Sequence, residues 1–144
     1  MLGGGSFGTA IANMLASNAY PVVLWMRNAQ HAQQVQKERV NQRYLPGYKL
    51  AQSLQVSADL NACLQGVDTV FFAVPSGALQ DLAAQVSPRL EPETLVISTS
   101  KGICGADFML PSQILETAMP DVRIGVMSGP NLAKEIADYE ITAT

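Results

Sequence analysis

Short apolar runs alternate with amphipathic stretches along almost the whole chain. The runs have the length of buried strands, and the stretches between them repeat their apolar positions at helical spacing. The predicted strands cover residues 21–26, 54–56, 69–74, 94–98 and 123–127, and the predicted helices cover residues 9–18, 29–39, 59–64, 77–86, 111–119 and 132–139. Asn28 and Ser57 are the predicted caps of the second and third helices, and residues 41–52 are predicted to form a loop. This alternation predicts an α/β protein with a parallel sheet.

The segment Gly3-Gly4-Gly5-Ser6-Phe7-Gly8 has the spacing G-x-G-x-x-G and leads directly into the first predicted helix. Free amides at the start of a helix, together with the helix dipole, form a site that fits a pyrophosphate. Gly3 permits a tight turn, Gly5 lets the backbone approach the phosphates, and Gly8 lets the helix pack closely on its strand. In this context the motif predicts a Rossmann-type, doubly wound parallel sheet that binds a dinucleotide. A glycine-rich turn without a ligand is the alternative interpretation.

Both ends of the chain fall inside predicted strands. Only Met1 and Leu2 precede the glycine motif, where the central strand of such a sheet belongs. Residues 140–144 alternate polar and β-branched side chains and then stop. We therefore expect residues 1–144 to be one NAD(P)-binding domain of a longer protein, truncated in its first strand and near its C-terminus.

The composition narrows the function classes. Hydrophobic residues make up 48% of the chain and charged residues 15%, which argues against disorder. A net charge of −3 gives no electrostatic reason to expect nucleic acid, and no apolar run is long enough to span a membrane. Cys63 and Cys104 do not form a C-x-x-C pair, so we expect free thiols in a reducing cytoplasm, and we expect no metal site.

Ligands of doubly wound sheets bind beyond the carboxyl ends of the strands. Arg27 follows the second predicted strand, where NAD-specific sites carry an acidic residue for the ribose 2′-hydroxyl. A guanidinium can instead pair with a 2′-phosphate, so Arg27 favours binding of NADP(H) or tolerance of both cofactors. The alternative interpretation is that Arg27 is a solvated surface arginine. Lys101 follows the strand at 94–98, and its charge suits a substrate phosphate or a polarised carbonyl oxygen, although an ordinary loop lysine would also fit there.

Taken together, several short blocks resemble the bacterial NAD(P)-dependent glycerol-3-phosphate dehydrogenases. They occur in the family's order and span nearly the whole chain: Gly3-Gly4-Gly5-Ser6-Phe7-Gly8-Thr9-Ala10, Val22-Val23-Leu24-Trp25, Tyr44-Leu45-Pro46, Ala73-Val74-Pro75-Ser76, Ser100-Lys101-Gly102 and Ser128-Gly129-Pro130-Asn131-Leu132-Ala133-Lys134-Glu135. The reaction that the resemblance implies is hydride transfer between NAD(P)H and dihydroxyacetone phosphate, giving sn-glycerol 3-phosphate for phospholipid synthesis.

The resemblance also implies roles for particular residues. The cofactor-binding positions that it implies are Gly3, Gly5, Ser6, Phe7, Gly8, Arg27, Tyr44, Lys101 and Ala133, and the substrate-binding positions are Lys101, Gly129 and Asn131. Phe7 replaces a commoner Trp or Tyr, and Asn131 replaces a frequent Ser or Thr. No residue matches the family's catalytic lysine, so the resemblance places that lysine in a helical domain outside this chain. A homodimer is left open.

Two other functions remain open at this point. One is a different two-domain reductase of the ketopantoate or hydroxyacyl-CoA type, against which the blocks around Lys101 and Asn131 argue. The other is a non-catalytic dinucleotide-sensing domain, which needs the glycine loop and Arg27 but neither Lys101 nor Asn131. We expect the fragment alone to lack enzymatic activity, because the acid/base residue would lie elsewhere.

Overall fold

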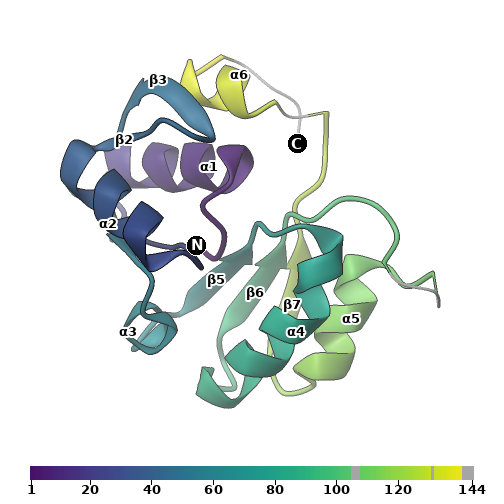
Figure 1. Ribbon diagram of the computed structural model, residues 1–144. Helices are drawn as coiled ribbons and strands as arrows, with labels where there is room; N and C mark the ends of the chain where they lie inside the picture. The colour runs from purple at the N-terminus through teal and green to yellow at the C-terminus, as the bar shows by residue number, and fades with distance from the viewer. Residues whose placement is uncertain (105–107, 131, 141–144) are drawn as a thin grey trace.

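A parallel sheet with helices on both sides forms the centre of the computed structural model, which describes residues 1–104, 108–130 and 132–140 (Figure 1). In chain order the strands of this sheet are β1 (Val23–Trp25), β4 (Gln55–Ser57), β5 (Thr69–Phe72), β6 (Leu95–Ser98) and β7 (Arg123–Val126). Strand β1 pairs with β4, and β5, β6 and β7 pair in that order, always parallel. The predicted α/β class is therefore confirmed.

Leu2 joins the two halves of the sheet. It forms parallel bridges to Trp25 of β1 and to Phe72 of β5. Its amide donates to the Phe71 carbonyl at 2.8 Å, and its own carbonyl accepts from Ala73 at 2.8 Å. The resulting order, β4, β1, Leu2, β5, β6, β7, is the doubly wound order with the first segment at the centre.

The helices form close to their predicted positions. They are α1 (Ser6–Ser17), α2 (Ala29–Glu38), α3 (Leu60–Leu64), α4 (Ser76–Val86), α5 (Pro111–Ala118) and α6 (Ala133–Ala137), with a 3₁₀ turn, η1, at Ser87–Arg89. The predicted cap at Asn28 is confirmed, since its side chain accepts from the His31 amide at 2.8 Å. The predicted cap at Ser57 is wrong, because the carboxylate that accepts the α3 amide of Ala62 belongs to Asp59. A carboxylate at that position also interacts favourably with the helix dipole.

The segment predicted as a loop contains a small antiparallel hairpin. Strand β2 (Val40–Asn41) pairs with β3 (Leu45–Lys49), and the register shifts between Val40 and Asn41. The alternating pattern of a strand is missing here, because Pro46 and Gly47 are exposed and Leu45 alone in β3 is buried. The hairpin lies beside α1 in Figure 1, and both Leu45 and Ile11 of α1 belong to the same apolar cluster.

The main core lies between the sheet and helices α4 and α5. Phe72, Leu79, Val96 and Leu115 are fully buried there, together with Leu2. An apolar hollow of about 410 Å³ lies at the amino end of β1 and β5. Cys63 and Cys104 are both buried and not paired with each other, and burial raises the pKa of the Cys63 thiol.

Among the residues described, no helix has the length and apolar character needed to cross a membrane.

Candidate functional site

The glycine loop lies at the carboxyl edge of the sheet, between Leu2 and α1. Gly3 has φ +115, and a Cβ there would lie 2.3 Å from the Ala73 carbonyl oxygen. A Cβ on Gly8 would lie 2.0 Å from the Gly3 carbonyl oxygen. By contrast, a Cβ on Gly5 would meet nothing within 4 Å. The first and third glycines are thus required by packing, whereas the second borders open space, as a ligand-facing position should.

This difference predicts opposite outcomes for two alanine substitutions. Gly8→Ala should lower the free energy of unfolding by about 1–3 kcal/mol, because overpacking outweighs the helix propensity that alanine adds. Gly5→Ala should leave the free energy of unfolding within about 0.5 kcal/mol of the parent, since its methyl group meets no protein atom. It should nevertheless weaken dinucleotide binding, because the methyl group enters the ligand's space. Chemical denaturation and NADPH titration of both variants test this pair, and a destabilised Gly5→Ala variant would contradict it.

Arg27 and Tyr44 lie on one side of the loop. Arg27 is exposed in the turn between β1 and α2, directly after Met26, whose side chain packs against Gly4. Tyr44 is 40% exposed, and its carbonyl oxygen accepts from the Ser6 hydroxyl at 2.5 Å. This bond fixes the β2–β3 turn to the first residue of α1, and so brings Tyr44 close to the glycine loop.

The Tyr44 ring also lies among cationic and aromatic groups. The Arg43 guanidinium is 5.2 Å from its ring centroid, and the His31 ring centroid is 5.7 Å away. An aromatic face with a guanidinium beside it can hold an adenine ring and a phosphate on the ribose that carries it. Arg43 and His31 are not recognisable as neighbours of Tyr44 from the sequence, because their proximity to it depends on the hairpin.

Lys101 lies on the other side of the loop and joins two of the predicted positions. Its Nζ donates to the Gly129 carbonyl oxygen at 2.8 Å and lies 6.0 Å from the Phe7 ring centroid. Gly129 follows β7, whereas Phe7 belongs to α1. The fold therefore brings Phe7, Lys101 and Gly129 together from three separate segments, as the strand-end argument predicts.

Two hydroxyl groups hold the segment that carries Lys101. Thr99 Oγ1 donates to the Phe72 carbonyl oxygen at 2.9 Å, and Ser100 Oγ donates to the Val74 carbonyl oxygen at 2.7 Å. Thr99 is buried, so its bond fixes the end of β6 against the end of β5 in a water-excluded position. The sequence shows these hydroxyls only as ordinary loop residues, since their acceptors lie on a different strand.

Ala133 is the first residue of α6 and packs in the same apolar cluster as Phe7 and Met127. Helix α6 is tied to β3 by the Tyr48 hydroxyl, which donates to the Asp138 carboxylate at 2.9 Å. This hydrogen bond raises the pKa of Tyr48. The remaining predicted position, Asn131, lies outside the described residues.

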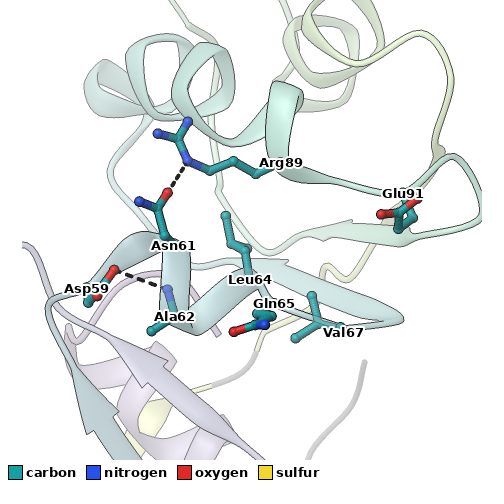
Figure 2. Close-up of a pocket in the computed structure, with 9 residues that line it drawn as sticks. Asp59, Asn61, Ala62, Leu64, Gln65, Val67, Arg89 and Glu91 are labelled. Carbon is teal, nitrogen blue, oxygen red and sulfur yellow. Dashed lines mark hydrogen bonds between the residues drawn. The ribbon is translucent and has the colours of Figure 1, made fainter.

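A hollow of about 560 Å³ lies between α3 and η1, away from the glycine loop. Figure 2 shows Arg89 of η1 reaching across to Asn61 of α3, where Nε donates to Oδ1 at 2.5 Å. Asp59 is turned toward its own helix, where it accepts from the Ala62 amide. None of the predicted site residues that the structure describes lines this hollow or the apolar one at the amino end of the sheet. The sequence-predicted site is therefore the open carboxyl edge around the glycine loop.

Curated relatives match the entire chain. The chain is 49% identical over 144 residues to a protein of Teredinibacter turnerae and 51% identical to one of Ectopseudomonas mendocina, both named glycerol-3-phosphate dehydrogenase [NAD(P)+]. In each case the match covers 100% of this chain and 42% of the relative. The chain thus spans less than half the length of these relatives.

Solved structures of similar proteins also superpose on this chain. Glycerol-3-phosphate dehydrogenase of Coxiella burnetii superposes with a TM-score of 0.89 at 36% identity, over 95% of this chain and 42% of that one. A ketopantoate reductase of Ralstonia eutropha superposes less well, with a TM-score of 0.67 at 25% identity, over 88% of this chain and 40% of that one. The family described as the NAD-dependent glycerol-3-phosphate dehydrogenase N-terminus matches residues 1–144. The chain belongs to this family.

Proposed function

We propose that residues 1–144 form the cofactor-binding domain of an oxidoreductase that interconverts dihydroxyacetone phosphate and sn-glycerol 3-phosphate with NAD(P)H. One observation carries the proposal. The glycine loop is flanked by Arg27 and Tyr44 on one side and by the Lys101–Gly129 contact, next to Phe7, on the other. The names of the relatives support the substrate and the cofactor.

The residues around the loop fit a dinucleotide. Helix α1 begins at Ser6, and its first backbone bond runs from the Thr9 amide to the Gly5 carbonyl at 3.0 Å. The amides of Ser6, Phe7 and Gly8, in the first turn of the helix, therefore have no helical acceptor and are free for a pyrophosphate. Met26 occupies the space beside Gly4, whereas Gly5 borders open space, so the approach of the phosphates is directed to Gly5.

The side containing Lys101 would hold the reacting groups. The bound cofactor supplies the hydride, and the protein positions it and stabilises the charge that develops on the substrate oxygen. Lys101 places a positive charge beside the aromatic ring of Phe7 and can exchange its bond to Gly129 for one to a substrate oxygen. We assign the acid/base lysine and most of the phosphate binding to a helical domain beyond this chain, and substrate contacts within it to Lys101, Gly129 and Asn131.

Cellular context is part of the same proposal. A role in phospholipid synthesis follows from the product, sn-glycerol 3-phosphate. Two buried thiols that are not paired with each other support a reducing, cytoplasmic location. A homodimer of the full-length protein is the assembly to test, by light scattering.

An assay of the full-length protein tests the function directly. NADPH oxidation should depend on dihydroxyacetone phosphate and should not occur with ketopantoate or an acyl-CoA ketone. The weaker superposition on ketopantoate reductase supports this choice of substrate. A protein that binds NADPH but reduces none of these ketones would favour the sensing domain instead.

Arg27→Asp should change the cofactor preference. Because a charge-assisted hydrogen bond contributes roughly 1.5–3 kcal/mol, NADPH binding should weaken about tenfold or more while NADH binding changes little. Steady-state KM values for both cofactors measure the difference. Arg123→Asp is the matched control, since it makes the same change in net charge at an exposed position where β7 begins. An equal loss for both cofactors would show that Arg27 does not contact the 2′-phosphate.

A further inference from the structure

A buried amide side chain lies directly beneath the glycine loop. Asn41, the last residue of β2, has an exposed fraction of 0%. Its Nδ2 donates to the Gly4 carbonyl oxygen at 3.0 Å and to the Thr9 hydroxyl at 2.9 Å. Its Oδ1 lies 3.1 Å from Nε2 of His31. The amide thus uses both of its donors and its acceptor inside the protein.

The partners fix the orientation of this amide. A backbone carbonyl oxygen can only accept a hydrogen bond, so the nitrogen of Asn41 must face Gly4. The oxygen of Asn41 then faces His31, and the Nε2 atom of His31 carries the proton that it donates. Since Asn41 has no freedom to rotate without losing bonds, it holds the Gly4 carbonyl in one direction.

That direction decides where the next amide points. The Gly4 carbonyl and the Gly5 amide belong to one planar trans peptide, so they point in opposite directions. With the Gly4 oxygen held inward by Asn41, the Gly5 N–H faces away from Asn41, and Gly5 itself borders open space. Adjacent glycines have little intrinsic preference for one peptide orientation, so an external contact is needed to select it.

We propose that Asn41 is a positioning residue that aims the Gly5 amide at the cofactor pyrophosphate. This inference rests on the proposed dinucleotide-binding function. It assigns the β2–β3 hairpin a role that its sequence does not reveal. The hairpin carries Tyr44 on its turn and also sets the geometry of the phosphate-binding loop from below.

The test compares two ligands that differ in the pyrophosphate. NADPH and adenosine 2′-monophosphate share the adenosine and its 2′-phosphate, and NADPH alone reaches the glycine loop with a pyrophosphate. In the full-length protein, Asn41→Ala should weaken NADPH binding about tenfold, the effect of losing one amide bond to a charged phosphate. Binding of adenosine 2′-monophosphate should stay within about twofold of the parent. Isothermal titration gives both dissociation constants.

Two further variants separate positioning from general destabilisation. Asn41→Leu keeps nearly the volume of the side chain but has no donor for the Gly4 carbonyl, so it should show the same selective loss if Asn41→Ala does not fold. Asn13→Ala is the matched control, because Asn13 also joins α1 to the segment after β3, through the Ala51 amide at 2.7 Å. It should lower stability without changing the ratio of the two dissociation constants.

The outcomes are distinguishable. Equal weakening of both ligands in the Asn41 variants, or the same change of ratio in Asn13→Ala, would mean that Asn41 has only a structural role. A parent protein that binds neither ligand would overturn the proposed function, and this inference with it.

Discussion

The 144-residue chain alone is expected to bind NADPH and yet to reduce dihydroxyacetone phosphate at least about 1000-fold more slowly than the full-length protein. The glycine loop, Arg27 and Tyr44 are all present, and these are the groups to which the proposed function assigns the adenosine half of the cofactor. Catalysis also needs an acid/base at the carbonyl, which contributes about 10²–10⁴-fold, and a second wall that fixes the substrate and excludes water. Within the proposed function, both are assigned to a domain beyond this chain.

NADPH fluorescence titration and an absorbance assay on the same preparation separate binding from turnover. Binding first establishes that the chain is folded, so that a missing rate cannot be attributed to misfolding. Leu2 pairs with both neighbouring strands, which supports a folded sheet. Turnover close to that of the full-length protein would refute the assignment of acid/base chemistry to a second domain.

Lys101→Ala in the full-length protein is expected to lower kcat about 100-fold while leaving the fold intact. Removing one preorganised charge from the point where negative charge develops typically has this effect on the rate. The folded state should tolerate the change, because Lys101 is exposed and its hydrogen bond to the Gly129 carbonyl is at the surface. Thr99 and Ser100 would still hold the loop in place.

Steady-state kinetics and thermal unfolding of the same variant check both parts of this prediction. Lys37→Ala is the matched control, since Lys37 is an exposed lysine in the last turn of α2, whereas the turn carrying Arg27 lies at the other end of that helix. An unchanged kcat for Lys101→Ala would remove Lys101 from the site.

The sequence by itself determined the parts that depend on local patterning. Strands such as β5 and β6 were predictable because each is a nearly continuous apolar run, with one face buried and the other half-buried. The glycine spacing predicted the loop, and the structure shows why Gly3 and Gly8 tolerate no side chain. Strand ends meet at one edge of a parallel sheet, so the sequence also predicted that Arg27 and Lys101 lie at the same edge as the glycine loop.

The tertiary structure decided the features in which distant segments meet. Asn41 looks like an ordinary polar loop residue until the hairpin folds over α1 and buries it against Gly4 and Thr9. The contact of Lys101 with Gly129 likewise depends on β6 and β7 being neighbours. Short-range periodicity in the sequence shows which face of a helix or strand is apolar. Hydrogen bonds between distant segments form only once packing has removed the water that would otherwise bond to their donors and acceptors.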